Sequence, residues 1–229
     1  MLTSPLRWRG NDWALFGGLV AGTVALSLID EDVNSFFQRN QGKIGNDLSE
    51  IGVELGEARV VVLLTGGVYA FGLIGDNDWA RETAVILTAS LIPMGSVQAL
   101  TNNLVGRARP KIGEGAWVFD PFTRQEAYAS FFSGHTLTAM SMAHVFGKRI
   151  DNPAAKIFFY GAGSLAAVSR LYNEDHWLTD VVFASAVSIT SVNAVAKWLE
   201  RRRHGKRWSG TAQLRVRPWL RGVQLGLEW

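Results

Sequence analysis

Six apolar runs constrain what this chain can fold into more than any other feature of its sequence. None of them contains Asp, Glu, Lys or Arg, and the longest have 16 to 18 residues. As helices, these would reach roughly 24–27 Å, just under the ~30 Å hydrocarbon core of a bilayer. We therefore predict an all-α fold, a six-helix transmembrane bundle in which the shorter runs pack inside or borrow flanking residues. The runs are 13–29, 60–75, 83–100, 136–146, 157–168 and 181–196.

The alternative is a soluble helical protein with unusually apolar helices, and average composition does not decide between the two. Hydrophobic residues make up 48% of the chain, and the mean hydropathy is only +0.08. Two local patterns favour the membrane. Small residues crowd the runs, as in GGLVAG and GAGSLAAVS, which suits close helix packing in lipid. Tryptophans lie near run ends, where an aromatic belt forms: Trp13, Trp79, Trp177 and Trp198.

The distribution of Lys and Arg predicts the orientation. The N-terminus, the even-numbered loops and the tail hold 15 of them, against 8 on the opposite side. By the positive-inside rule the tail KWLERRRHGKR is cytoplasmic and the odd-numbered loops face outward. We expect an integral protein of a bacterial inner membrane, with its first run retained because no cleavage site closes it. The basic tail fits an anchor to anionic membrane lipids better than a nucleic-acid site.

Two domains are expected. Residues 1–207 would form the membrane domain, with short interfacial helices in the first outward loop, 34–56. Residues 208–229 alternate apolar and polar side chains in AQLRVR and GVQLGLEW, which predicts a C-terminal β-hairpin. The chain has no cysteine, which excludes disulfides and thiol chemistry. Its oligomeric state is not indicated by the sequence.

Three polar segments next to apolar runs, all on the predicted outward side, carry the candidate chemistry: NNLVGRARP (102–110), FFSGH (131–135) and SRLYNEDHWLTD (169–180). In the third, His176 and Asp180 are spaced i, i+4, which places them on one helix face. A carboxylate hydrogen-bonded to one imidazole nitrogen fixes the tautomer and leaves the other nitrogen to attack. His176 is therefore the candidate nucleophile, with Asp180 as its partner.

The remaining polar residues suit an anionic substrate. Arg109 and Arg170 supply guanidinium groups that bind phosphate oxygens bidentately. Ser133 and Gly134 open a helix, where a hydroxyl and backbone N–H groups face the same anion. His135 is then placed to protonate a leaving oxygen. Together these groups describe phosphoryl transfer through a phosphohistidine.

The three segments resemble the signature of the type-2 phosphatidic acid phosphatase (PAP2) superfamily: Lys-x6-Arg-Pro, Pro-Ser-Gly-His and Ser-Arg-x5-His-x3-Asp. The third motif is complete here from Ser169 to Asp180, and the second is present as Ser133-Gly134-His135 with Phe132 in place of proline. The first is present at Arg109-Pro110. The resemblance implies the six-helix PAP2/acid phosphatase fold and a reaction that needs no metal or other cofactor.

Carried onto this chain, the family's roles agree with those above. His176 would be the nucleophile, Asp180 its partner and His135 the general acid. The phosphate would be held by Arg109, Arg170, Ser133 and the Gly134 amide.

One position departs from the signature. Asn102 stands where the family has lysine, seven residues before Arg109. Loss of one charged transition-state contact costs about 2.7–4 kcal/mol, or roughly 10²–10³ in rate, by comparison with a lost oxyanion donor. Arg107 and Lys111 are the nearby residues that would compensate, and the amide of Asn102 still donates a hydrogen bond.

The leading interpretation is an integral-membrane, metal-independent phosphatase. Its substrate would be a lipid phosphate or diphosphate, such as phosphatidate, phosphatidylglycerol phosphate or a polyprenyl diphosphate. Two alternatives stay open at this point. One is a non-catalytic or weakly active lipid-phosphate binding or scaffold protein, which the loss of the lysine favours. The other is a vanadium haloperoxidase-like enzyme, because those enzymes share the three-part site.

Overall fold

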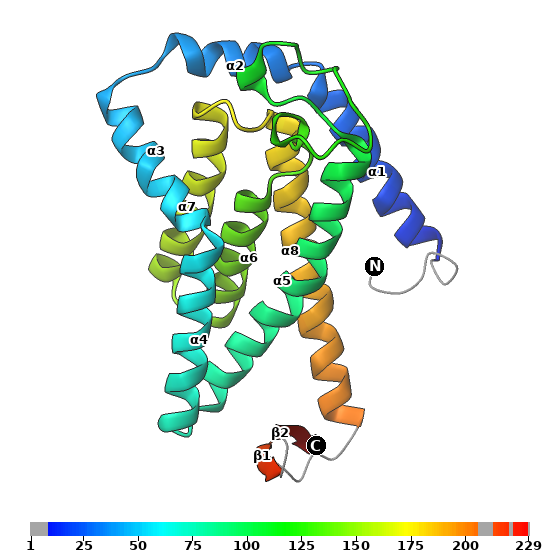
Figure 1. Cartoon of the computed structure of the whole chain (residues 1–229). Coiled ribbons are helices and arrows are strands. Elements are labelled where there is room, and N and C mark those ends of the chain that lie inside the picture. The colour runs from blue at the N-terminus through cyan, green and yellow to red at the C-terminus, as the bar shows by residue number, and fades with distance from the viewer. Residues whose placement is uncertain (1–8, 206–212, 220–221, 229) are drawn as a thin grey trace. The chain divides into compact units, whose positions relative to one another are not determined.

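The computed structural model describes residues 9–205, 213–219 and 222–228, and within these ranges the chain is mainly helical (Figure 1). It divides into two compact units, with the boundary after Val195. The domain boundary expected at residue 207 falls outside the described residues. The α-helices are α1 (Gly10–Ser27), α2 (Asp30–Arg39), α3 (Lys43–Gly56), α4 (Ala58–Ile74), α5 (Asp78–Val105), α6 (Gly134–Arg149), α7 (Pro153–Tyr172) and α8 (Leu178–Gly205).

Each of the six apolar runs falls within or almost within one long helix, which confirms the all-helical interpretation of residues 10–205. The number of spans differs from the expectation. In the described part of the chain, α5 and α8 alone are long and apolar enough to cross a membrane. The pairs α1–α2 and α3–α4, bent by 50° and 54°, add up to two more if each pair is one span. By length and composition the structure thus supports two to four candidate spans in the described residues, fewer than a bundle of six membrane helices would show.

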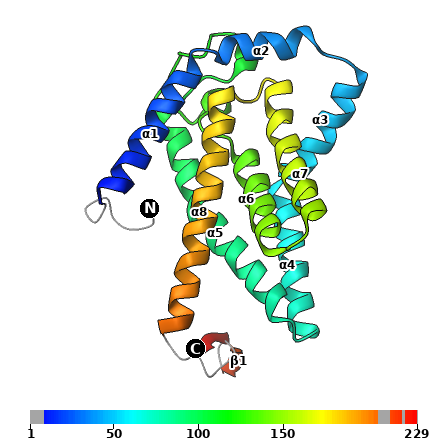
Figure 2. The ribbon, with the colours of Figure 1, turned by 180° about the vertical axis from the view of Figure 1, so that it is seen from behind.

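The physical reason lies in α6 and α7. Helix α6 has only 16 residues, and most of it is buried among its neighbours. Helix α7 carries Lys156 near its start and Arg170 near its end, which lowers the mean hydropathy of the segment. Helix α6 packs against both α5 and α7, so it forms the interior of the bundle (Figures 1 and 2).

Helix α3 lies close against α7 because small residues line its contact face. Gly45, Ser49, Gly52 and Gly56 are spaced at i, i+4, i+7 and i+11, which puts them on one side of the helix. A Cβ at Gly52 would lie 2.7 Å from the carbonyl oxygen of Leu165, so the two backbones approach more closely than any side chain would allow. This contact holds α3 against α7 at the end of the bundle that carries the three polar segments.

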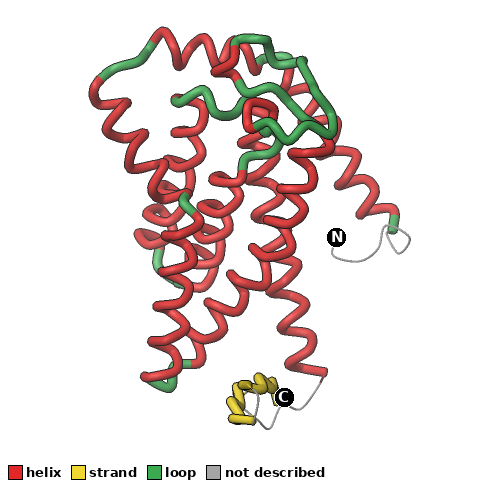
Figure 3. The backbone as a smooth tube through the Cα atoms, viewed as in Figure 1, coloured by secondary structure: helices red, strands yellow, loops and turns green. Residues whose placement is uncertain are grey.

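A long loop, residues 106–133, covers the end of the bundle at which α7 is joined to α8 (Figure 3). It starts at Gly106, which ends α5 in the left-handed conformation with φ +60°. A side chain there would overlap the carbonyl oxygen of Asp120, so only glycine fits. The loop then pairs with itself through Ala108 N–H and the Val118 carbonyl, 3.0 Å apart. Short 3₁₀ helices at Pro110–Ile112 and Glu126–Tyr128 complete it.

In the second unit, strands β1 (Gln213–Trp219) and β2 (Gly222–Glu228) pair antiparallel, with Val216 opposite Leu225. The turn that would join them, residues 220–221, lies outside the described residues. The hairpin therefore stays a prediction.

Candidate active site

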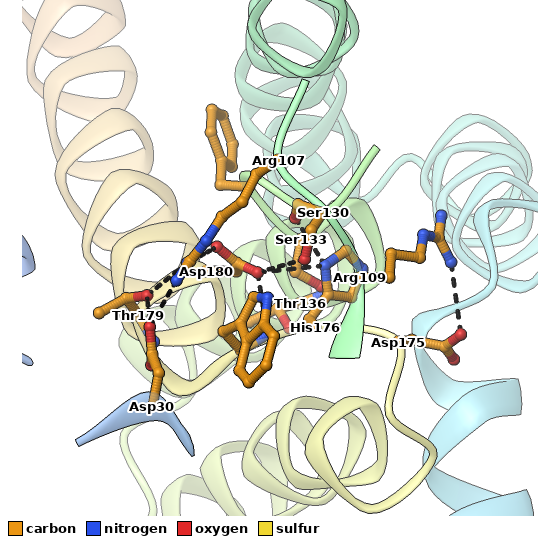
Figure 4. Close-up of polar contacts among 12 residues, drawn as sticks. Asp30, Arg107, Arg109, Ser130, Ser133, Thr136, Asp175, His176, Thr179 and Asp180 are labelled. Atoms are coloured by element: carbon orange, nitrogen blue, oxygen red, sulfur yellow. Dashed lines mark hydrogen bonds and ion pairs between the residues drawn. The ribbon is translucent and has the colours of Figure 1, made fainter. Parts of the chain in front are cut away.

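The three polar segments meet at the loop-covered end of the bundle, where direct contacts join them (Figure 4). The indole N–H of Trp177 donates to the carbonyl of Ala108 at 2.7 Å, which joins the first segment to the third. The backbone N–H of Ser133 donates to the carbonyl of Asp180 at 3.4 Å, which joins the second to the third. Residues that the sequence separates by up to about 70 positions thus share one site.

His176 is buried, with 6% of its side chain exposed. Its Nδ1 lies 2.7 Å from the backbone carbonyl oxygen of Ser130. Because a carbonyl oxygen only accepts, Nδ1 carries the proton of the neutral ring and Nε2 carries the lone pair. Burial, together with the positive charge of Arg109, lowers the pKa of His176 from 6.5 to about 3. The ring is therefore a neutral imidazole with an unprotonated Nε2, the form required of a nucleophile.

Asp180 does not make the hydrogen bond that its spacing predicts. Its Oδ2 is 3.9 Å from His176 Nδ1, which is too long for a hydrogen bond. Instead Oδ2 accepts from the Ser130 hydroxyl at 2.5 Å and from the Trp177 backbone N–H at 2.9 Å. The predicted direct pair is thus corrected. Ser130 stands between the two residues, with its hydroxyl on Asp180 and its carbonyl on His176.

Arg107 holds Asp180 from the other side within a fully paired buried network (Figure 4). One guanidinium nitrogen donates to Asp180 Oδ1 at 2.6 Å and to Thr179 Oγ1 at 2.7 Å. The other donates to Asp30 Oδ2 at 2.7 Å and to the Ala116 carbonyl, which also accepts from Nε. All five guanidinium N–H donors are used. The suggestion that Arg107 compensates for Asn102 at the phosphate is therefore wrong, because no donor is left for a substrate.

Arg109, Lys111 and Arg170 converge on one carboxylate, that of Asp175. Lys111 Nζ is 2.9 Å and Arg109 Nη1 3.3 Å from Oδ1, and Arg170 donates to Oδ2. Burial would raise the pKa of Asp175, but the hydrogen bond from Lys111 and the charges of both arginines hold it below its usual value. Three cations therefore surround one carboxylate: Arg109 and Arg170 from the first and third segments, and Lys111, which directly follows the first.

We refer to Arg109, Lys111 and Arg170 as the basic cluster. Two of its guanidinium N–H donors are unpaired within the described part of the chain. The Nε atoms of Arg109 and Arg170 are buried, and neither has a hydrogen-bond partner among the residues that the structure describes. A buried donor without an acceptor costs free energy until an acceptor arrives. Two N–H donors of the cluster are therefore left for a further acceptor.

The second segment positions the start of α6. The Ser133 hydroxyl accepts from the Thr136 backbone N–H at 3.3 Å, so Ser133 caps the helix, and its side chain is fully buried. Gly134 is the first residue of the helix, where backbone N–H groups lack intrahelical partners. His135 is one-third exposed, and its Nε2 lies 3.1 Å from Glu57 Oε1. Glu57 comes from the break between α3 and α4.

Asn102 lies on α5, one turn after Gln98, whose side-chain amide donates to the Phe132 carbonyl at 3.1 Å. The i, i+4 spacing puts both amides on the face of α5 that contacts the second segment. The Oδ1 of Asn102 is buried, and no donor reaches it from the described part of the chain.

Four site residues were missed from the sequence: Asp30, Glu57 and Ser130 as residues with a role, and Asp175 as the shared partner of three cations. Asp175 lies inside the third motif and Ser130 directly precedes the second segment, so their positions in the sequence were a signal. Asp30 ends a run of apolar residues and begins a new helix. Among the residues that the structure describes, no group of three His, Asp or Glu side chains is placed to hold a metal ion.

Fold and site together define a class: a helical bundle with apolar candidate membrane spans and a buried histidine beside an anion-binding cluster. A model of the PAP2 superfamily matches residues 83–204, more than half of the chain, and this range contains all three segments. The chain belongs to the PAP2 superfamily.

Two solved structures share the fold at 16% identity. The crystal structure of LpxE from Aquifex aeolicus aligns with a TM-score of 0.60 over 74% of this chain and 95% of that one. The other is that of the first transmembrane PAP2-type phosphatidylglycerolphosphate phosphatase, from Bacillus subtilis. It aligns with a TM-score of 0.56 over 83% of this chain and 97% of that one. No sequence among curated proteins matches the chain.

Proposed function

We propose that this protein is an integral-membrane phosphatase that hydrolyses a lipid phosphate or diphosphate through a phosphohistidine. The observation that carries the proposal is the state of His176. Its Nδ1 is fixed on the Ser130 carbonyl, so that Nε2 holds the lone pair, and the charges of Arg109 and Arg170 act on the ring. A nucleophile beside an anion clamp is the arrangement that phosphoryl transfer requires.

The reaction follows from these groups. Nε2 of His176 bonds to phosphorus as the ester P–O bond breaks, and the leaving alkoxide takes a proton from His135. Water then attacks the phosphorus, its proton passes to His135, and the P–N bond breaks to release inorganic phosphate. Arg109, Arg170 and Lys111 would hold the phosphoryl oxygens as negative charge shifts among them. Asp180 acts one step away, through Ser130, and Arg107 acts through Asp180.

The substrate class is inferred from the surroundings of the site. The site lies at one end of a bundle with two to four apolar candidate spans, so a substrate with acyl or prenyl chains would reach it from the bilayer. One of the two structural neighbours is by its title a transmembrane PAP2-type phosphatidylglycerolphosphate phosphatase, which supports the same class. The distribution of Lys and Arg supports a site that faces outward, with the tail in the cytoplasm.

The test is release of inorganic phosphate by purified protein in mixed micelles. A panel would contain phosphatidate, phosphatidylglycerol phosphate and a polyprenyl diphosphate, each assayed with wild type and His176→Asn. We expect turnover of at least one substrate and a loss of about 10³-fold or more in the variant, because the nucleophile is removed. Equal, slow hydrolysis by both proteins would favour the non-catalytic scaffold, which Asn102 and the occupied cluster around Asp175 also fit.

A further inference from the structure

We infer that Glu57 is a positioning residue for His135, the proton donor of the proposed reaction. This inference rests on the proposed function and adds a residue outside the three motifs. Glu57 Oε1 is 3.1 Å from His135 Nε2, and both side chains are one-third exposed, so the pair lies at the edge of the site. The charge of Glu57 also acts on Arg170, which places the carboxylate beside the basic cluster.

The chain holds Glu57 there through the break between α3 and α4. Glu57 is both the C-cap of α3 and the N-cap of α4, and its backbone is extended, with φ −64° and ψ 129°. The break lies against the start of α6: the Thr138 hydroxyl, which donates to the Gly134 carbonyl at 2.5 Å, is also 3.2 Å from the Gly56 carbonyl. A Cβ at Gly56 would lie 3.0 Å from His135 Cβ, so the absence of a side chain lets the ring pack against the backbone.

This contact decides which nitrogen of His135 faces the substrate. With Nε2 directed at Glu57, Nδ1 is the nitrogen left for the leaving oxygen. In the protonated ring, Nε2–H donates to the carboxylate and Nδ1–H is the proton that moves. After the transfer the ring is neutral, with its remaining proton on Nε2 and held by Glu57. Nδ1 is then the base that receives the proton of the attacking water.

The leaving group of the substrate distinguishes a role in proton donation from a structural role. Loss of proton donation slows only those substrates whose leaving group needs a proton. A nitrophenolate leaves without a proton, whereas an alkoxide needs one. The experiment measures kcat/KM, which reports the steps through phosphoryl transfer, for p-nitrophenyl phosphate and for a short-chain phosphatidate in detergent micelles. Proteins are wild type, Glu57→Ala, Glu57→Gln and His135→Ala, with Glu54→Gln as the control. Glu54 lies on α3 and pairs with Arg59 at the surface.

We expect Glu57→Ala to lower kcat/KM for the phosphatidate by about 10–10²-fold and for p-nitrophenyl phosphate by less than about 3-fold, the pattern also expected of His135→Ala. Glu57→Gln keeps an oxygen acceptor and should recover part of the loss, and Glu54→Gln should match wild type. Adding Glu57→Ala to His135→Ala should cost nothing more.

Equal losses on both substrates, or additive losses in the double variant, would overturn the inference and assign Glu57 a structural role. If Glu57→Ala does not fold, as judged by thermal unfolding in detergent, the comparison is made with Glu57→Gln, which must then show the selective loss. If the wild type hydrolyses another lipid of the panel and not phosphatidate, that lipid takes the place of the phosphatidate in this comparison. A wild type that hydrolyses none of these substrates would instead overturn the proposed function itself.

Discussion

His176 donates its Nδ1 proton to the backbone carbonyl of Ser130 across 2.7 Å, while the carboxylate of Asp180 stays 3.9 Å away. The hydrogen bond to this backbone carbonyl thus fixes the tautomer of the nucleophile, His176. In a Ser-His-Asp triad, the Asp→Asn change costs about 10⁴ in kcat because the wrong histidine tautomer forms. A side-chain change at Asp180 leaves the Ser130 carbonyl in place, so the tautomer should survive it.

We therefore expect Asp180→Asn to lower kcat by less than about 10²-fold and to lower the free energy of unfolding by about 1–3 kcal/mol, because one charged partner of Arg107 is lost. Phosphate release and thermal unfolding in detergent measure the two effects. A loss near 10⁴ at unchanged stability would mean that Asp180 bonds directly to His176 during the reaction.

The depressed pKa of His176 predicts a histidine that does not titrate near neutral pH. With a pKa of about 3, its ring stays neutral throughout the range from pH 8 to pH 5. In ¹⁵N-histidine spectra, the signal that disappears in His176→Asn should not move over this range. A midpoint near the ordinary 6.5 would contradict the burial and charge argument.

The lowered pKa of His176 also makes the free energy of unfolding depend on pH. Below about pH 6.5 the unfolded chain binds a proton at this position that the folded chain does not. Stability from this group is complete above pH 6.5 and is lost as the pH falls toward 3, by up to about 1.4 kcal/mol per pH unit. The pH dependence of unfolding should therefore be shallower in His176→Asn over this window.

Arg107 is predicted to be a structural residue of the site and not a phosphate ligand. It pairs with Asp30 and Asp180, which expose none of their side-chain area. Replacing it with Met leaves two buried carboxylates without a cation, which typically costs 3–5 kcal/mol. We expect Arg107→Met to unfold at a much lower temperature, and Arg124→Gln, at an exposed loop position, to match wild type. A folded Arg107→Met whose only defect is weaker phosphate binding would contradict this role.

The sequence predicted the helices and the motif residues because both depend on local patterns. Apolar runs gave α4, α5 and α8 by length and hydrophobicity, and the third motif identified His176 by its spacing to Arg170 and Asp180. The number of spans does not follow from the apolar runs, because a helix buried by protein, such as α6, is as apolar as one buried by lipid. Only the three-dimensional packing separates the two.

The partners of the motif residues were not predictable in the same way. Asp30 is 77 positions from its partner Arg107, and Glu57 is 78 from His135. Each contact depends on how a break between two helices docks onto the bundle. The Ser130 carbonyl is a backbone group, which no residue type reveals. Local spacing therefore identified which side chains react, whereas tertiary structure determines what orients them.

Asp175 is expected to compete with the substrate phosphate for the basic cluster. Its carboxylate already pairs with Arg109, Lys111 and Arg170. Asp175→Asn removes this charge and should tighten inhibition by inorganic phosphate or vanadate by roughly 10-fold, about 1.4 kcal/mol. The control is Glu174→Gln at the neighbouring carboxylate, which accepts from Asn34 instead. Weaker inhibition in Asp175→Asn would show that the carboxylate is needed to hold the cations in place.

Asn102→Lys should restore the charge that the family signature places on α5. The buried Oδ1 of Asn102 has no hydrogen-bond donor in the described part of the chain, so replacing the amide breaks no contact that the structure shows. We expect kcat/KM for the phosphate ester to rise by about 10-fold or more, a fraction of the 10²–10³ that one transition-state contact contributes. Asn103→Lys adds the same charge at the next, exposed position and should have little effect. A large loss in Asn102→Lys would show that the pocket depends on the amide.

A second comparison tests whether Lys111 has taken over from the missing lysine. Lys111 is the cation of the cluster that the signature does not contain, and it lies 2.9 Å from the carboxylate that occupies the cluster. If it binds the substrate phosphate, Lys111→Met should lower kcat/KM by about 10²-fold, and Asn102→Lys in the same protein should recover most of that loss. Recovery requires that the two ammonium groups reach the same phosphoryl oxygens, because charge added elsewhere near the site would act only weakly through solvent. If Asn103→Lys rescues as well as Asn102→Lys, the gain comes from net charge alone and Lys111 has no specific role.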